Sequence, residues 1–198
     1  MSGRLKLMLA VVAIAIVAVT GAYTWARFVA TTGNGNNSIA SGTVNISDND
    51  TGNSVVALTN ATPGASNSGC IKVSYQGTLA SGVRLYGTTT GSGLDQYLDL
   101  TVTRGAYSPS DPVIGSCTNF QPDSTDYIGA GAGVIYNGTL QGFPDTWAAG
   151  LVDANTGSPE VWNTGEAHVY RFQVTLQDNV GAEGLTSTQA FTWEARNQ

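Results

Sequence analysis

Apolar and polar residues alternate with period two in several short stretches of this chain. In the clearest one, Tyr170, Phe172, Val174 and Leu176 are separated by single polar residues. This alternation is typical of a β-strand that buries one face. No helical period of any length follows residue 26, so the chain must bury its apolar residues mainly in sheets.

The same pattern predicts further strands with turn-forming residues between them. Turn signals include Pro63-Gly64 and Asn137-Gly138. Many short strands with one buried face each predict an all-β fold, a jelly-roll-like sandwich of two packed sheets. The expected strands are 39–47, 71–75, 98–103, 170–176 and 191–196, with weaker ones at 55–58, 83–86 and 134–136.

Two stretches fit the strand pattern poorly. Residues 105–132 and 138–166 are rich in Gly, Pro and Asp and are long for loops of a compact domain, which indicates a functional role or undetected strands. Short helical turns are possible at 94–98 and 146–152. We find no internal repeat and no second globular domain.

The N-terminus has the layout of a secretory signal. Arg4 and Lys6 precede an unbroken apolar run from Leu7 to Val19, and small residues follow. The run is shorter than the ~20 residues of a comfortable membrane helix, although extending it to Trp25 gives a marginal span. We therefore expect export, with cleavage favoured and an uncleaved anchor as the alternative.

Thr24-Trp25-Ala26 places small residues at −3 and −1 of a cut after Ala26. A cut after Ala22 fits nearly as well. Loss of residues 1–26 leaves 6 of the 8 basic residues against 14 acidic ones, a formal charge of −8. Because nucleic-acid affinity depends on basic contacts to phosphate, we expect no nucleic-acid partner. We expect membrane contact only through the N-terminal segment before cleavage.

The chain has two cysteines, Cys70 and Cys117. In an exported chain, a single pair is most simply an intrachain disulfide. Two buried thiols and a bond between chains are the alternatives.

Recognisable catalytic machinery is absent from the sequence. His168 is the one histidine, so a zinc-protease helix with two histidines cannot be formed, and no Gly-x-Ser-x-Gly occurs. Asp48-Asn49-Asp50 resembles the start of a calcium loop, but Thr59 stands where an EF-hand needs glutamate. We expect no enzymatic activity, no cofactor and no metal, and leave calcium dependence open.

Three aromatic residues in the second long stretch allow a carbohydrate-binding alternative. Trp147 and Trp162 lie near Phe143 in sequence, and aromatic residues on loops can stack against sugars. Packing in the core is the more common use of such residues.

Two motifs stand near the start of the chain: Thr-Trp-Ala-x-Phe within Gly21–Phe28, and Ala-Ser-Gly-Thr within 39–47. Together with Tyr170–Leu176 and Phe191–Ala195 near the other end, they resemble the TasA/camelysin family of exported bacterial biofilm-matrix proteins. Pro63-Gly64 ahead of the strand at 71–75 fits as well. The cysteine pair and residues 105–166 depart from the family pattern.

The resemblance implies a jelly-roll domain, a dedicated signal peptidase and filaments built by donor-strand exchange. In such exchange, the N-terminal segment of one subunit completes a sheet of the next. Some camelysin members have been described as metalloproteases, but no zinc motif here supports that activity.

On this basis the chain divides into a signal peptide (1–26), a donor segment with a flexible hinge (27–38) and a β-sandwich domain (39–198). The expected hinge contains Gly33 and Gly35. The expected partners are copies of the same chain and the signal peptidase, and the expected location is extracellular or at the cell surface. A monomeric or tethered surface protein and a camelysin-like protease are the alternatives. The expected donor strand consists of Arg27, Phe28, Val29, Ala30, Thr31 and Thr32.

Overall fold

The structure is a computed structural model that describes residues 29–32 (backbone only), 44–49, 52, 54–113, 115–152 and 161–197. The expected signal peptide, its cut site at Thr24, Trp25 and Ala26, and the hinge glycines Gly33 and Gly35 lie outside these residues. So do Arg27 and Phe28 of the expected donor strand. Within the described ranges, no helix is both long and apolar enough to cross a bilayer.

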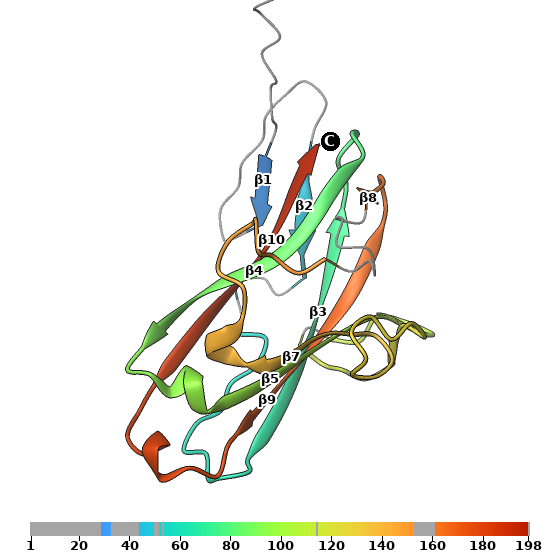
Figure 1. Ribbon diagram of the computed structural model, residues 1–198. Helices are drawn as coiled ribbons and strands as arrows, with labels where there is room; N and C mark the ends of the chain where they lie inside the picture. The colour runs from blue at the N-terminus through green and yellow to red at the C-terminus, as the bar shows by residue number, and fades with distance from the viewer. Residues whose placement is uncertain are drawn as a thin grey trace, which may run out of the picture.

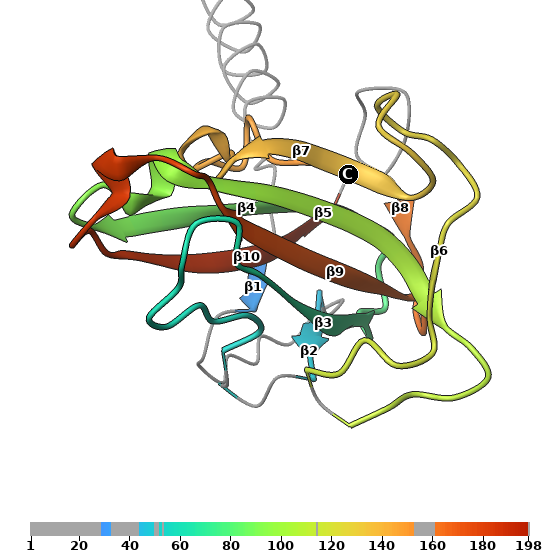
Figure 2. The same ribbon diagram turned by 90° about the horizontal axis from the view of Figure 1, so that it is seen from below.

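Two antiparallel sheets pack face to face, so the predicted all-β sandwich is confirmed (Figures 1 and 2). The first sheet has the order β1-β10-β4-β8, with β1 Val29–Thr32, β10 Ser187–Asn197, β4 Ser81–Gly91 and β8 Val161–Trp162. The second has the order β2-β3-β9-β5-β6, with β2 Ile46–Asp48, β3 Ser66–Tyr75, β9 Ala167–Leu176, β5 Leu98–Tyr107 and β6 Phe120–Pro122. A further strand, β7 Val134–Thr139, pairs with β5.

The pairing of eight of these strands gives the jelly-roll topology. Along the chain, the first strand pairs with the last (β1 with β10), the second with the second-last (β3 with β9), and so inward through β4 with β8 to β5 with β7. The chain therefore folds like one long antiparallel hairpin wrapped over itself, with β2 and β6 as additions. Figure 1 shows the consequence at the N-terminus, where β1 lies beside the far end of β10 and runs against it.

The core consists of the inward-facing residues of both sheets. Tyr170, Phe172, Val174 and Leu176 of β9 are buried as the alternation predicts, and Trp193 and Ala195 of β10 lie across from them in the core cluster. The rings of Phe172 and Phe191 lie 4.2 Å apart between centroids, which joins the two sheets. This burial of apolar area is the main stabilising contribution expected for a sandwich.

Most of the predicted strands are confirmed, and the one expected at 55–58 is wrong. Residues 55–58 are not a strand; they run without a ladder partner while Asn67 Nδ2 donates to the carbonyl of Ala57 at 2.7 Å. Val55, Val56 and Leu58 pack on the core, which explains their apolar pattern without a strand. Of the strand expected over 39–47, residues 46 and 47 lie in β2, residues 44 and 45 do not, and residues 39–43 lie outside the described part.

In the described ranges, three short 3₁₀-helices connect strands: η1 Leu94–Tyr97, η2 Leu140–Gly142 and η3 Val180–Ala182. The helical turn expected at 94–98 is therefore confirmed. The one expected at 146–152 is instead a single turn, in which the amide of Gly150 donates to the carbonyl of Trp147 at 3.1 Å.

The first long stretch, 105–132, contains a loop that covers the outer face of the second sheet. Figure 2 shows the yellow-green connection between β5 and β6 swinging out past the end of β5 and returning. Cys117 in this loop is bonded to Cys70 of β3, and the amide of Cys70 donates to the carbonyl of Gly115 at 3.2 Å. The loop and strand enclose a small second cluster that includes Phe120 and Val169.

Candidate assembly edge and polar clusters

The described part of the expected donor strand forms β1, at the edge of the first sheet. Its register pairs Val29 with Arg196, Ala30 with Ala195, Thr31 with Glu194 and Thr32 with Trp193. Ala195 and Trp193 are 0 % and 2 % exposed, so β1 runs beside a part of β10 that belongs to the core. In this chain the segment thus pairs with the last strand of its own domain.

β10 is much longer than the strand beside it. On one side it pairs with β4 from Ser187 to Asn197, and on the other with β1 from Trp193 to Arg196. Within the described residues, 187–192 have no strand on the β1 side. β1 therefore covers this edge of β10 only from Trp193 to Arg196, and β10 is the strand with which β1 pairs.

A buried carboxylate lies on the outer face of this sheet, beside β1. The side chain of Glu194 is 4 % exposed; it accepts a 2.6 Å hydrogen bond from the Tyr86 hydroxyl and pairs at 2.6 Å with Nε of Arg196. Buried charges are stabilised when they are paired and hydrogen-bonded, as this one is. Burial and the hydrogen bond to Glu194 together raise the pKa of Tyr86 to about 12.

Trp147 covers the same face from the loop between η2 and β8. Two guanidinium groups lie over its indole ring. The Cζ atom of Arg196 is 4.3 Å from the ring centroid, and that of Arg84 is 5.4 Å from it. Arg84 also donates to the carbonyls of Trp147 and Ala148 at 3.2 and 2.8 Å. These contacts hold the loop on the sheet through cation–π attraction and hydrogen bonds.

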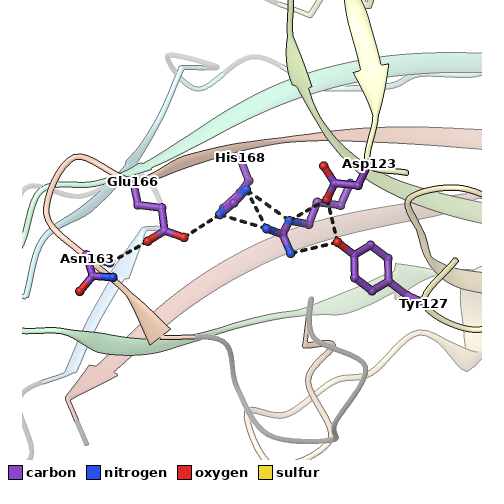
Figure 3. Close-up of polar contacts among 6 residues, drawn as sticks. Asp123, Tyr127, Asn163, Glu166 and His168 are labelled. Carbon is purple, nitrogen blue, oxygen red and sulfur yellow. Dashed lines mark hydrogen bonds and ion pairs between the residues drawn. The ribbon is translucent and has the colours of Figure 1, made fainter. Parts of the chain in front are cut away.

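A second polar cluster, shown in Figure 3, lies at one end of the sandwich around Arg104 and His168. Arg104 Nε lies 3.2 Å from a carboxylate oxygen of Asp123 and 3.2 Å from Nδ1 of His168. Tyr127 donates to Asp123 at 2.8 Å and accepts from Arg104 at 3.3 Å. His168 Nε2 lies 3.0 Å from Glu166.

Glu166 is the acid whose ionisation this cluster alters. Burial raises the pKa of Glu166, but the amide of Asn163, which donates to it at 2.9 Å, and the His168 ring more than compensate. The net effect is a pKa below the ordinary value, because the hydrogen bonds from Asn163 and His168 and the electrostatic effect of His168 favour the charged form.

The geometry of this cluster is that of a mutually satisfied network. Arg104 belongs to the inward-facing row of β5 and is 7 % exposed, so its charge needs the carboxylate of Asp123. His168 contacts Arg104 on one side, Glu166 on another and the ring of Trp162 at 4.6 Å between centroids. The arrangement joins β5, β9 and the segments that follow β6 and β8, which stabilises this end of the fold.

The predicted disulfide is confirmed. Cys70 and Cys117 are bonded, with their Cα atoms 5.1 Å apart and a sequence separation of 47. Cys70 is 1 % exposed. The bond fixes the outer loop to β3, which belongs to the second sheet, whereas β1 belongs to the first.

The aromatic platform considered from the sequence is not formed. Trp162 is fully buried and Phe143 is 6 % exposed, and both belong to the core, where Phe143 packs edge-on against Phe191. Trp147 alone lies outside, in contact with Arg84 and Arg196. Among the described residues, no group of three His, Cys, Asp or Glu side chains is placed to hold a metal ion.

Sequence reasoning did not find Arg104 or Glu194. Both are charged residues within apolar strand patterns. Their burial depends on partners from other segments, Asp123 for Arg104 and Tyr86 for Glu194. The signal available in the sequence was a charged residue within a strand pattern, since charged residues are rarely buried unless they are paired.

No protein-family model and no curated protein matches this chain. The similarity of its two ends to the TasA/camelysin family therefore stays an expectation from the sequence.

Proposed function

We propose that this chain is a non-enzymatic structural subunit of an extracellular filament or biofilm matrix. Residues 1–26 direct its export, and the segment 27–32 then joins one subunit to the next. The observation that supports this most directly is β1: a short edge strand, directly after the expected cleavage site, that pairs with the last strand of the jelly roll.

Edge strands are the natural sites for such assembly. An edge with free amides and carbonyls pairs readily with a strand from another chain, and the backbone hydrogen bonds contribute affinity. A segment given to a neighbour makes a head-to-tail contact, which extends into a filament when the rotation between subunits does not close a ring. The acidic mature chain stays soluble until these contacts form.

The alternatives make different predictions. A monomeric or tethered surface protein would not polymerise at any concentration, and a carbohydrate-binding protein would retain a polysaccharide. A camelysin-like protease would cleave substrates in a metal-dependent way. Only the filament hypothesis requires regular fibres from the purified mature protein.

Deletion of residues 27–32 tests the proposal. The shortened protein should keep its remaining strands and lose polymerisation, as judged by circular dichroism and by electron microscopy. Phe28→Asp should also prevent assembly, because an unpaired charge in an apolar groove has a large desolvation cost. Val180→Asp is the matched control, since Val180 is 94 % exposed.

A synthetic peptide of residues 27–32 provides an independent test. It should cap growing wild-type filaments by occupying the acceptor site, and a scrambled peptide should not. Filaments of unchanged width and repeat from the deletion variant would place the joining segment elsewhere. Wild-type protein that never polymerises would favour the tethered monomer.

A further inference from the structure

Arg171 is a cation on the outer face of the second sheet. It projects from β9, where its register partners are Cys70 of β3 and Thr103 of β5. Its Cζ atom lies 5.2 Å from the ring centroid of Phe120 in β6, the strand that follows the outer loop. Arg171 is half-buried, so it stands at the border between the part of this face that the loop covers and the part that is open to solvent.

Arg171 differs from the other cations of the described part in its partners. Three of them pair with a carboxylate: Lys72 with Asp111, Arg104 with Asp123 and Arg196 with Glu194. Arg84 donates to two backbone carbonyls. Within the described residues, Arg171 has neither kind of partner: Nη2 donates to the Thr103 hydroxyl at 3.4 Å, beyond the ordinary range, and the buried Nε makes no hydrogen bond. A guanidinium this far from water normally has an anion beside it.

Beyond Arg171, polar side chains form two rows across β3, β9, β5 and β7, which lie side by side in Figure 2. The first row is Ser68, Gln173, Thr101 and Asn137, and the second is Ser66, Thr175, Asp99 and Thr139. All of them are exposed or half-buried. Hydrogen bonds between neighbouring strands orient them, from Thr101 to Asn137 at 3.3 Å and from Thr175 to Ser66 at 3.0 Å. We call these the polar rows.

The chemistry of the polar rows favours a sugar over a protein as the ligand. Hydroxyl and amide groups both donate and accept, as the hydroxyls of a sugar do. A protein partner would need an apolar centre of contact. The large exposed apolar residues of the described part lie outside the polar rows: Leu79, Val113, Ile128, Val161 and Val180.

The charges on this face determine where the ligand is acidic. The planar guanidinium of Arg171 matches a carboxylate, which can accept two parallel hydrogen bonds from it. Asp99 in the second row accepts from Gln177 at 2.7 Å and would repel a second carboxylate nearby, whereas it can accept from a neutral sugar hydroxyl. The acidic mature chain also disfavours a polymer with a charge on every sugar.

We infer that Arg171 and the polar rows bind an extracellular polysaccharide in which uronic-acid carboxylates are separated by neutral sugars. The carboxylate pairs with Arg171, and the neighbouring sugars exchange hydrogen bonds with Gln173 and the rest of the polar rows. This site goes beyond the proposed function, because it lies on the second sheet and does not depend on polymerisation or on β1.

Affinity electrophoresis of freshly purified mature protein tests this inference. The native gel contains hyaluronan, in which glucuronate alternates with a neutral sugar, and a second gel contains the same polymer with its carboxyl groups reduced to alcohols. Wild-type protein should be slowed by hyaluronan, with an affinity at least about tenfold higher than for the reduced polymer. A gel without polysaccharide gives the reference mobility.

Two variants with matched controls assign the effect to the site. Arg171→Gln should bind hyaluronan no better than the reduced polymer, whereas Lys72→Gln, which loses the same charge from the same face, should bind as wild type does. Gln173→Ala should weaken binding to both polymers, whereas Gln141→Ala, an exposed glutamine outside the polar rows, should not. Circular dichroism verifies that each variant is folded.

Three results would overturn the inference: wild type that is slowed by neither polymer, wild type that binds both equally, or Arg171→Gln that binds hyaluronan as wild type does. Wild type that associates without polysaccharide, in a way that Arg171→Gln abolishes, would also overturn it, because a second copy would then supply the carboxylate. Filaments without retardation contradict this inference alone, and retardation without filaments contradicts only the proposed function.

Discussion

The Arg104 guanidinium lies against the imidazole of His168, with Nη2 3.0 Å and Nε 3.2 Å from ring Nδ1. Arginine can only donate, so Nδ1 is placed to accept from the guanidinium, while Nε2 lies 3.0 Å from Glu166 and 3.3 Å from Arg104 Nη2. The ring therefore connects Arg104 of β5 to Glu166, which directly precedes β9.

Glu166 should make the stability of the fold depend on acid pH. Its folded-state pKa lies below the ordinary value of 4.5, so its contribution is full above that value and is lost as the pH falls through it toward the lower folded pKa. Glu166→Gln should be less stable than wild type at pH 7, and the difference should shrink below about pH 4.5. Denaturant unfolding at several pH values measures this.

Glu183→Gln serves as the control for that series, because Glu183 is an exposed acid on the connection after η3. Its unfolding free energy at pH 7 should be close to that of wild type, because substitutions of exposed side chains usually change stability little. Equal curves for Glu166→Gln and wild type would contradict the role assigned to the Asn163 and His168 contacts.

Removing the Tyr86 hydroxyl should destabilise the fold more than removing a comparable neutral hydrogen bond. Tyr86→Phe leaves the buried carboxylate of Glu194 without one of its donors, a loss of about 1–3 kcal/mol. Tyr136→Phe removes a 2.6 Å bond to the backbone carbonyl of Thr139 and should cost about 1 kcal/mol. Chemical denaturation of both variants gives the comparison.

The same contact can be followed by titration. Tyr86 should ionise near pH 12, and Glu194→Gln should lower its pKa toward 10, because the carboxylate contributes to the shift along with burial. Absorbance near the tyrosinate band, with Tyr86→Phe used to identify the signal, measures both. An unchanged titration in Glu194→Gln would show that burial alone raises this pKa.

Loss of the disulfide should act on stability and spare the β1 edge. Replacing both cysteines by serine removes a constraint on a 47-residue separation, about 4 kcal/mol in the chain-entropy model. Hydrogen exchange should increase most in the loop around Gly115, which is bonded to Cys70. A reduced protein with wild-type stability would contradict this expectation.

Long strands with one face in the core were the predictable part of this fold. β9 and β10 could be predicted from Tyr170–Leu176 and from Phe191–Arg196, because alternation is a local property. β4 extends to Gly91 beyond its expected end because it pairs with β10 at positions such as Thr88 with Ala190, and that pairing is not visible locally. The apolar residues 55–58 look like a strand because packing on the core needs the same composition.

The candidate site was predictable only in part for the same reason. The sequence predicted that residues 27–32 form a strand given to a neighbouring subunit, but not that residues 29–32 pair with β10 of their own chain, across most of the sequence. Likewise Arg104 is tolerated in an inward-facing row because Asp123 and His168 come to it from separate segments. Contacts between distant segments have no local signature.

Processing should leave β1 intact, and this is the condition on which the proposed assembly depends. A cut after Ala26 leaves two residues ahead of β1, which begins at Val29, and a cut after Ala22 leaves six. Mass spectrometry of exported protein should show a chain that begins at Arg27, because Thr24 and Ala26 satisfy the small-residue rule. Ala26→Leu should block this cut or shift it to Ala22, whereas Arg27→Lys should leave it unchanged. A mature chain that begins at Met1, or after Thr32, would remove the basis for a donor strand, since β1 would then be either tethered to the membrane or absent.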